Sequence, residues 1–421
     1  MEKPSIQFEQ IVARGCGIDV HKKILVATIR GTGIREQTRE FSSYTSSIEE
    51  LRDWLQAHDI THVAMESTGV YWKPVYNILE SDFEVILVNA RHVKNVPGQK
   101  TDKKDSKWLT KLLLSGLLKG SFIPPKPTRE LRDLTRYRRK VVGTIASEKN
   151  RLQKILEDAN VKLSCVLSNM SGSVATKIIN AMLDGEEDIR ELVKFRHGRM
   201  KASEEELGLA LQGALSEHHR FMLGMIKSSL RDKEALIAQL DEQIEKHLRA
   251  HELELDAKLL ETIPGVGKDA AASIIAEVGN NMDQFPSVQH LASWAGMSPG
   301  NNESGGKKKS GRITHGNKYL RTLLVQCAWA ATRTKGTYLR SKYDSLVGRR
   351  GKKKALIAVG HKILIAIYYI LKDQVEYKEL GSDFLDNRRK NKQIQHHIKR
   401  LQDLGLDAEQ IKQLQELVKA A

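Results

Sequence analysis

Hydrophobic and polar positions follow short repeats over the first 120 residues of the chain. Five apolar or alternating runs predict β-strands, at 15–20, 23–29, 33–41, 61–67 and 83–90. Apolar residues at helical spacing predict three helices, at 46–58, about 70–81 and 101–118, the last with Thr101 as its N-cap. The connections between the first three strands suit an antiparallel meander, whereas the later strands alternate with helices. The pattern predicts an α/β domain over 1–125, built on a mixed sheet with helices on its faces.

The pattern becomes helical after the Pro-rich stretch 122–128. Two series of apolar residues recur at intervals of three, four or seven: Ile145, Leu152, Leu156, Ala159 and Leu163, and then Ile226, Leu230, Ile237, Leu240 and Ile244. They predict two long helices that pair as an antiparallel coiled coil, with a small helical insert at about 170–215. An ordinary helical core fits the same spacing equally well. We assign this helical region to 126–255.

The segment "LLETIPGVGKDAAASIIAEVG", residues 259–279, has the pattern of a helix-hairpin-helix. Gly265 and Gly267 permit a tight turn, and the backbone amides that open the second helix can hold a phosphate. A plain turn between helices is the alternative. Further apolar helices are predicted from Asn317 onward, which gives a mostly helical domain over 256–375 and a polar helical tail over 376–421.

Charge narrows the class of partner. The 421-residue chain has a net charge of +16, and residues 300–355 hold 15 Lys and Arg against two acids. A second basic cluster spans 129–140. Such concentrated charge favours a nucleic-acid backbone, while an aromatic content of 5% argues against a stacking platform for single strands. Three widely spaced cysteines indicate neither a disulfide framework nor a zinc site and fit a reducing, intracellular setting. No apolar run reaches about 18 residues, so we expect no membrane span.

Acidic residues stand at the ends of predicted elements. Asp19 ends the first strand, Glu66 ends the fourth, and Asp102 and Asp105 share one face at the start of a helix. Carboxylates from separate elements repel one another unless a cation joins them, and hard oxygen ligands suit one or two Mg²⁺ ions, for which Mn²⁺ can substitute. The alternative is that the two helical aspartates only serve the helix N-terminus. His21 is expected to be structural or solvated.

The stretch "PGNNESGGKKKSG", residues 299–311, places Ser304 between asparagines and glycines, just before three lysines. It is either a solvated basic turn or a nucleophile on a flexible loop. A serine hydroxyl needs a base or a metal for activation, and this motif contains no base.

Five motifs in one order cover about residues 14–335: "GIDVHKK", "MESTGVYW", "VNARHVKNVPGQKTDKKDSKWL", "IPGVGKDAAASIIAEVG" and "GMSPGNNESGGKKKSGRITHGNKYLRTLLVQCAWAA". In order and spacing they resemble the transposases of the insertion-sequence 110 family, which are bridge-RNA-guided DNA recombinases of bacterial mobile elements. The resemblance implies an N-terminal RuvC-like domain of the ribonuclease H fold. Its DEDD tetrad falls on Asp19, Glu66, Asp102 and Asp105.

The resemblance also implies a C-terminal transposase domain with a catalytic serine in an S-G-G-K context. Ser304 matches it, whereas Ser298 and Ser310 are not followed by Gly-Gly-Lys. The implied reaction is strand exchange through a covalent phosphoserine link to DNA, with Mg²⁺ held by the tetrad. The implied partners are target and donor DNA, a non-coding bridge RNA encoded by the element, and further copies of the chain, as dimers that assemble into a synaptic tetramer. The implied location is the bacterial cytoplasm, in association with the nucleoid.

Basic residues and hairpin glycines are the expected nucleic-acid contacts. They are Lys22, Lys23, Arg129, Arg136, Arg138, Arg139, Gly265, Gly267, Lys307, Lys308, Lys309, Arg312, Lys318 and Arg321. Two other functions remain open. One is a metal-dependent RuvC-like nuclease or Holliday-junction resolvase without a covalent intermediate. The other is a non-enzymatic architectural binder, which the clustered carboxylates disfavour because bare acids weaken phosphate binding.

Overall fold

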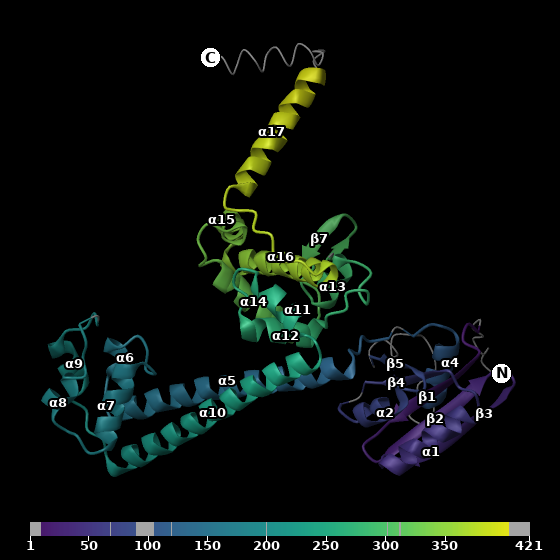
Figure 1. Ribbon diagram of the computed structural model, residues 1–421, viewed down its shortest axis with the longest axis horizontal. Coiled ribbons are helices and arrows are strands. Elements are labelled where there is room, and N and C mark those ends of the chain that lie inside the picture. Colours follow the sequence, from purple (N-terminus) through teal and green to yellow (C-terminus); the bar gives the residue numbers. More distant parts are fainter. Residues whose placement is uncertain are drawn as a thin grey trace. The chain divides into compact units, whose positions relative to one another are not determined.

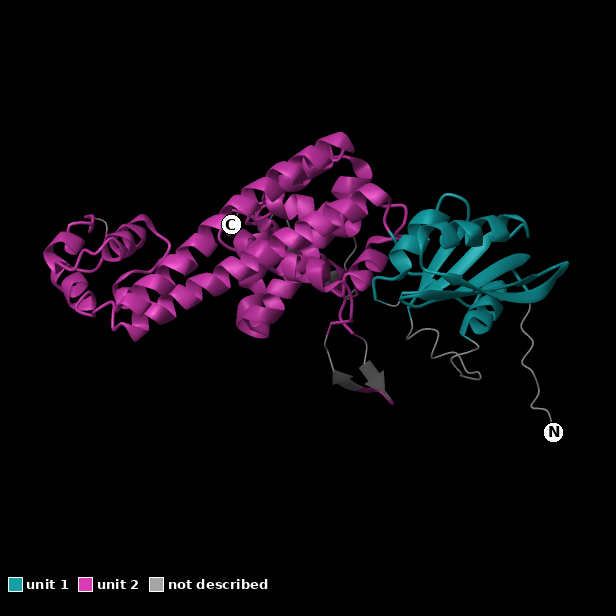
Figure 2. Cartoon of the chain, turned by 90° about the horizontal axis from the view of Figure 1, so that it is seen from below, with its two compact units in different colours: residues 1–123 teal, residues 124–421 magenta. Residues whose placement is uncertain are grey.

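The computed structural model describes residues 10–67, 69–89, 105–118, 120–198, 200–300, 302–310 and 313–403; within these, the side chains of 302–304, 308–310, 388–389, 391–392 and 401 lie outside the description. The chain forms two compact units, Met1–Ile123 and Pro124–Ala421 (Figure 2). Each unit has its own core, and we describe each by itself.

The first unit is built on a five-stranded sheet in the order β3-β2-β1-β4-β5 (Figure 1). Its strands are β1 (Arg14–Val20), β2 (Ile24–Gly31), β3 (Ile34–Ser42), β4 (His62–Glu66) and β5 (Glu84–Val88). The first three strands pair antiparallel, and β4 and β5 run parallel to β1. The predicted mixed sheet is therefore confirmed.

The two faces of this sheet are covered differently. Helices α1 (Thr45–Gln56) and α2 (Trp72–Leu79) pack on one face, where Ile18 and Met65 belong to the main core. Helix α4 (Asp105–Leu114) packs on β1 and β2. Side chains alternate along a strand, so the residues of β1 that face α4 are Gly15, Gly17 and Asp19.

Helix α4 is shorter than predicted. It ends at Leu114 rather than 118, because Gly116 takes a left-handed conformation with φ of 64°. The Leu114 carbonyl then accepts hydrogen bonds from the amides of Ile11 and Val12, at 2.7 and 3.0 Å. The predicted N-cap, Thr101, lies outside the described residues.

Two long helices open the second unit, α5 (Lys126–Asp158) and α10 (Glu217–Ala250), and they lie side by side (Figures 1 and 2). Contacts run from Pro127–His247 through Arg138–Asp241 to Asp158–His219. The helices are therefore antiparallel, as predicted. The periodicity failed at Leu163, which belongs to the next helix, because α5 ends at Asp158.

The insert begins somewhat earlier than predicted. It contains α6 (Leu163–Val166), α7 (Ser173–Leu183), α8 (Ile189–Val193) and α9 (Glu204–Ala210). These helices share a core with the end of α5 and the start of α10, through residues such as Leu156, Ile178 and Leu223.

The rest of the second unit is mostly helical. Its elements are α11 (Glu254–Glu261), α12 (Lys268–Val278), α13 (Val288–Trp294), β6 (Asn302–Ser304), β7 (Lys307–Ser310), α14 (Lys318–Ala331), α15 (Tyr338–Arg350), α16 (Lys352–Asp373) and α17 (Phe384–Asp403).

Helix α16 is the candidate for a membrane span by a test of helix length and apolar composition, whereas the sequence was expected to hold no such span. In the described part of the chain it alone passes that test of length and composition, over 22 residues, but half of its apolar stretch is buried. Val359, Ile363 and Ile367 are fully buried, and α16 packs against α11, α13, α14 and α15. It is therefore the central core helix of this part of the unit.

Candidate functional site

Three of the four predicted acidic ligands lie at one edge of the sheet. Ile18 pairs with Met65 across the parallel strands β1 and β4, so Asp19 and Glu66 follow one another at neighbouring carboxyl ends. Val63 and Met65 belong to the main core on the opposite face, so alternation turns Ala64 and Glu66 to the α4 face. Asp19 and Glu66 thus share both a face and an edge.

Helix α4 brings a third carboxylate to that edge. The amide of Gly17 donates to Thr110 Oγ1 at 2.9 Å, and Thr28 Oγ1 lies 2.8 Å from Ser106 Oγ. Leu113 lies against Gly15, whereas Ser106 and Thr110 lie against Gly17. The helix therefore runs opposite to β1, and Asp105, its first residue, lies toward the Asp19 end.

Close packing at Gly17 makes this approach possible. A Cβ atom there would lie 2.4 Å from the Ser106 carbonyl oxygen and 2.5 Å from the Thr110 nitrogen. Any side chain would push α4, and Asp105 with it, away from the sheet. Asp102 lies outside the described residues.

Asp19 has a neighbour to which the sequence interpretation gave no role. His21 Nε2 lies 3.0 Å from Asp19 Oδ2, and the Asp19 side chain is 16% exposed whereas that of His21 is 64% exposed. Residues i and i+2 point the same way in extended chain, which is the signal that relates the two. Lys22 and Lys23 are exposed in the turn that follows β1.

Ser304 ends strand β6, at a two-residue turn. The strands β6 and β7 pair antiparallel, with Ser304 opposite Lys307. Gly305 and Gly306 form the turn with φ of 58° and 74°, the two positive values that a type I′ hairpin requires. The predicted flexible loop is therefore a β-hairpin, labelled by β7 in Figure 1.

The base of this hairpin is fixed to the helical core. Pro299 and Ile313 form an antiparallel bridge, and the Thr314 amide donates to the Ser298 carbonyl at 3.1 Å. The Asn317 amide then donates to the Trp294 carbonyl at 3.2 Å. Ser304 thus lies near the tip of a hairpin whose base is hydrogen-bonded to the helical core.

Glu277 connects the base of the hairpin to α5. It is buried on α12, with 4% of its side chain exposed, and accepts two hydrogen bonds from Arg136, at 2.7 and 2.8 Å. Asn317 Nδ2 donates to the same carboxylate at 2.6 Å. The Asn317 side-chain oxygen also caps α14 by accepting from the amides of Tyr319 and Leu320. One carboxylate therefore joins three helices that lie far apart in the sequence.

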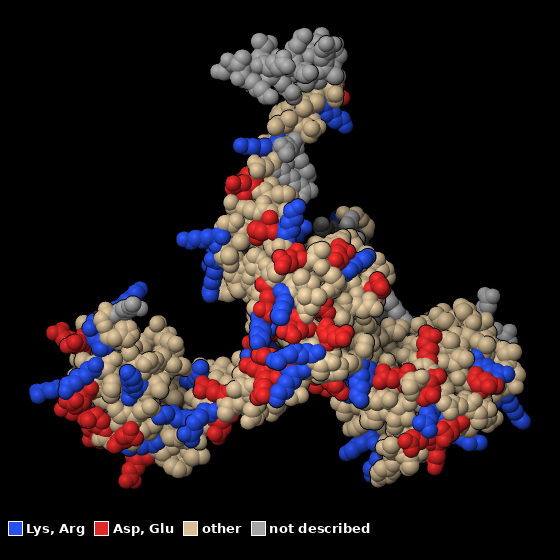
Figure 3. Space-filling model, in the orientation of Figure 1, with Lys and Arg blue, Asp and Glu red and all other residues tan. Residues whose placement is uncertain are grey.

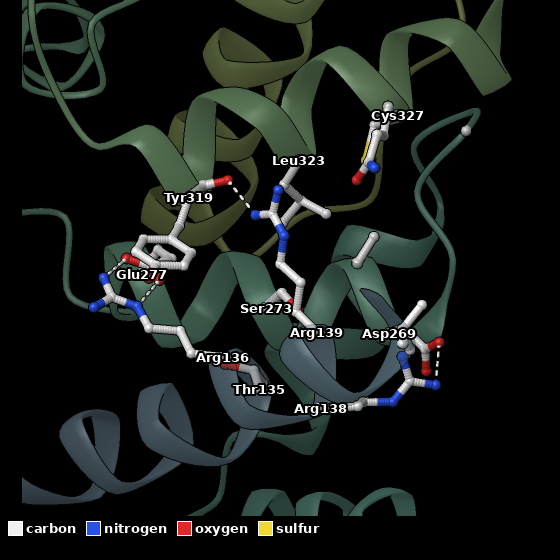
Figure 4. A pocket seen from close by; sticks show the side chains of 14 residues that line it. Thr135, Arg136, Arg138, Arg139, Asp269, Ser273, Glu277, Tyr319, Leu323 and Cys327 are labelled. Atoms are coloured by element: carbon white, nitrogen blue, oxygen red, sulfur yellow. Dashed lines mark hydrogen bonds and ion pairs between the residues drawn. The ribbon is translucent and has the colours of Figure 1, made fainter. Parts of the chain in front are cut away.

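Arg136, Glu277 and Tyr319 line a pocket of about 320 Å³ between α5, α12 and α14 (Figure 4). The Arg136 guanidinium lies over the Tyr319 ring, 4.0 Å from its centroid. Arg139 donates to the Tyr319 carbonyl at 3.3 Å. Cys327 also lines the pocket, and burial raises the pKa of its thiol to about 11, which keeps the thiol protonated and a poor nucleophile.

Two arginines expected to contact nucleic acid form ion pairs within the chain. Arg136 is neutralised by Glu277, and Arg138 binds both Asp241 and Asp269, the latter at 2.7 Å (Figure 4). Sequence reasoning did not reach these pairs because their partners lie on other helices.

Gly265 and Gly267, the glycines of the predicted helix-hairpin-helix, have different surroundings. Gly265 has φ of 86°, and a Cβ atom there would lie 2.4 Å from the Cys327 carbonyl oxygen, whereas one at Gly267 would meet nothing within 4 Å. Gly265 thus serves close packing of the turn on α14, and Gly267 caps α12 from open space.

The remaining basic candidates are divided. Lys307 and Lys318 are exposed, Arg321 is half-buried, and Arg129 donates to the Pro124 carbonyl at 3.0 Å. Arg312 and the side chains of Lys308 and Lys309 lie outside the description. On the face drawn in Figure 3, Lys and Arg alternate with Asp and Glu rather than forming one continuous patch.

Comparison with known proteins shows that both candidate sites lie within regions matched by family models. One family model, described as a transposase, matches residues 16–161, and a second, the transposase IS116/IS110/IS902 family, matches 257–344. The first range contains the acidic edge and α5, and the second contains Ser304, α12 and α14.

Several relatives carry related names. A probable family 20 transposase of Pseudomonas aeruginosa is 31% identical over 37% of this chain and 46% of its own length. The pilin gene-inverting protein of Moraxella lacunata is 26% identical over 85% of this chain and 95% of its own length. The transposase for insertion sequence element IS1111A of Coxiella burnetii is 30% identical over 41% of this chain and 49% of its own length. The alignments with the two transposases thus span about half of those proteins.

The two family regions occur here in one chain, and the alignment with the Moraxella lacunata relative covers 85% of this chain and 95% of that protein. The chain belongs to the IS110 family of transposases and is a DNA transposase or recombinase.

Proposed function

We propose that this transposase exchanges DNA strands under RNA guidance, through a covalent phosphoserine intermediate at Ser304. Asp19, Glu66, Asp102 and Asp105 are proposed to hold Mg²⁺. The observation that carries the proposal is the meeting of Asp19, Glu66 and Asp105, from two strands and one helix, on one face and one edge of the sheet.

Fold details belong to the same proposal. The sheet of 1–125, with three antiparallel strands followed by two parallel ones, is proposed to be RuvC-like. Helices α11 and α12 are proposed to form a helix-hairpin-helix that contacts DNA backbone. The regions 126–255, 256–375 and 376–421 are proposed to be a helical coiled-coil region with a small insert, a transposase domain and a helical tail.

The acidic edge has the right donors for a divalent cation. Carboxylate oxygens are the ligands that Mg²⁺ prefers, and a bound cation there would neutralise the carboxylates and polarise a DNA phosphate. Asp19, Glu66 and Asp105 would hold the cation, and α4 fixes the spacing through its packing on Gly17.

Ser304 would then act as nucleophile. The Ser304 hydroxyl loses its proton as its oxygen bonds to phosphorus, the bond from phosphorus to a sugar oxygen breaks, and that sugar oxygen takes up a proton, so one proton is lost and one is gained. The reverse reaction, with the hydroxyl of another strand, restores the phosphodiester and frees the serine. One ester is exchanged for another at each step, so strands are rejoined without an external energy source.

Relatives named for gene inversion support strand exchange over simple hydrolysis. Inversion of a gene requires that cut ends be rejoined, and the Moraxella lacunata protein aligns with 85% of this chain. A nuclease or resolvase that uses water remains the competing proposal, and it would leave no protein bound to DNA.

Substitution of the serine tests the mechanism. Ser304→Ala should abolish the covalent protein–DNA adduct seen after denaturation, while DNA binding is retained. Ser298→Ala is the matched control, since Ser298 lies six positions earlier, at the root of the hairpin, and should leave adduct formation intact. An adduct formed by the Ser304→Ala protein would refute this nucleophile.

The RNA partner and the synaptic tetramer need a separate experiment. The RNA that co-purifies with the full chain should contain one defined non-coding species with guide loops that pair with target and donor DNA. Random cellular RNA alone would contradict RNA guidance while leaving the serine chemistry open. Mass photometry with both DNAs and that RNA tests the proposed tetramer.

A further inference from the structure

A second group of metal-ligand side chains lies in the helical unit, separate from the acidic residues proposed above. Glu130 on α5, His247 in the last turn of α10 and His251 directly after that helix each offer one ligand atom, and these atoms all lie within 4.8 Å of one another. We propose that the three residues form a zinc site that joins the start of α5 to the end of α10.

Helix geometry brings the three together. His247 lies in the last turn of α10 and His251 is its C-cap residue, four positions later, and their ring centroids are 4.4 Å apart. Because α5 and α10 are antiparallel, Glu130 at the start of α5 lies opposite the end of α10. The same i, i+4 spacing of histidines on a helix serves zinc in other proteins.

A hydrogen bond already sets the state of His247. This residue is 8% exposed, and its Nε2 lies 2.8 Å from the Pro127 carbonyl oxygen. A carbonyl only accepts, so Nε2 carries a hydrogen and Nδ1 is the ring nitrogen left to bind a metal. Histidine ligands in metal sites almost always donate their other N–H in this way.

The other two side chains are able to move toward an ion. Glu130 and His251 are exposed, and neither side chain makes a hydrogen bond or ion pair with another residue in the described part of the chain. Ligands bound to zinc at about 2.0–2.2 Å lie roughly 3.5 Å apart. Rotations of side-chain torsions that move the ligand atoms by about 1 Å would therefore bring the three atoms to that spacing.

The ligand set favours a transition metal over Mg²⁺. Two imidazoles and one carboxylate are the protein ligands of some zinc sites, whereas Mg²⁺ prefers oxygen ligands alone. Water would take the fourth position. The wide spacing of the three cysteines indicates that they do not form a zinc site. It does not exclude a zinc site made of His and Glu side chains.

Zinc here would fasten the two ends of the long helical arm. The chain passes from the first unit into α5 just before Glu130, and α10 leads to α11 just after His251. The ion would therefore hold the point where the arm begins and ends, and its removal should lower the melting temperature of the helical unit.

Titration of the full chain tests the site. The protein is stripped with a chelator and titrated with ZnCl₂ in excess Mg²⁺, and bound zinc is counted by elemental analysis. One Zn²⁺ per chain is expected, with visible absorption typical of tetrahedral coordination when Co²⁺ replaces it. Glu130→Gln and His251→Asn should each weaken zinc binding by about tenfold or more, because even loss of an outer partner of a ligand costs about 10- to 100-fold.

Two controls separate this site from others. His218→Asn removes an exposed histidine near the opposite end of α10 and should leave the affinity for zinc unchanged. Asp19→Asn should also leave it unchanged, because the acidic edge is a different site. Three results would each overturn the proposal. They are the absence of stoichiometric zinc, an affinity for zinc in the Glu130→Gln and His251→Asn proteins equal to that of the wild type, and loss of zinc from the Asp19→Asn protein.

Discussion

At the scale of single residues, the buried carboxylate of Glu277 stabilises the packing of three helices in the helical unit. Burial alone raises the pKa of its carboxyl, but hydrogen bonds from Arg136 and Asn317, together with the charges of Arg136 and Arg132, outweigh this and hold the pKa below its ordinary value. The ionised carboxylate therefore stabilises the folded state.

Replacement of this carboxylate should be costly. Glu277→Gln leaves Arg136 and Arg132 without their counter-charge and should lower the free energy of unfolding by about 3 kcal/mol, the low end for a broken buried pair, because Arg136 is 35% exposed. Glu242→Gln is the control, since that exposed residue pairs with Lys246 on the surface of α10 and should barely change stability. Equal effects in urea unfolding would contradict the assignment.

The pH dependence of that difference has a defined sign. A group whose folded pKa is depressed contributes stability above its unfolded pKa, about 4.3 for Glu. That contribution is lost as the pH falls through the folded pKa. The stability difference between wild type and the Glu277→Gln protein should therefore be constant above about pH 5 and shrink below about pH 4. A difference that grows in acid would show that the carboxylate is not held ionised.

At the scale of elements, close backbone contact at Gly17 controls where α4 sits. Gly17→Ala should lower stability by about 1–3 kcal/mol through overpacking and should also reduce adduct formation, because Asp105 moves with α4. Gly143→Ala is the matched control: it lies within α5 with nothing within 4 Å of its Cβ position and should stabilise by about 0.5–1 kcal/mol. Calorimetry and the adduct assay together distinguish a displaced helix from a merely weakened fold.

The hairpin that carries Ser304 makes a second prediction at this scale. Gly305 has φ of 58° and nothing within 4 Å of its Cβ position, so only backbone conformation limits substitution. Asn adopts this conformation readily in type I′ turns, whereas Val does not. If Ser304 is the nucleophile, Gly305→Asn should retain most of the rate of adduct formation and Gly305→Val should lose about tenfold or more. Equal rates would mean that the turn does not position the serine.

Sequence patterns predicted elements better than contacts between them. Alternation and helical spacing act locally, so the strands, the mixed sheet and the two long helices were predictable. The Glu277–Arg136 pair joins residues 141 positions apart, and no local pattern encodes it. The β6–β7 hairpin was missed because its strands are three and four residues long and polar, although Gly-Gly between them is a known turn signal.

At the scale of the whole molecule, net charge overstates the number of cations available to a nucleic acid. The chain carries +16, yet Arg136 and Arg138 are matched to carboxylates within the fold. Paired arginines stabilise the helical unit and release few counterions. Exposed lysines of the segment 300–355, such as Lys307 and Lys318, are better placed to contact phosphates.

Salt dependence separates these two roles. Each lysine that neutralises a DNA phosphate adds about 0.9 to the slope of log affinity against log salt. Lys307→Ala and Lys318→Ala should therefore each reduce the slope by about one, with stability unchanged. Lys246→Ala should leave the slope unaltered, because Lys246 lies on α10 in a 2.7 Å pair with Glu242. The measurement is DNA affinity between about 50 and 200 mM salt. An unchanged slope in both the Lys307→Ala and Lys318→Ala proteins would remove this segment from the DNA path, and the basic excess would then have to serve RNA binding or assembly.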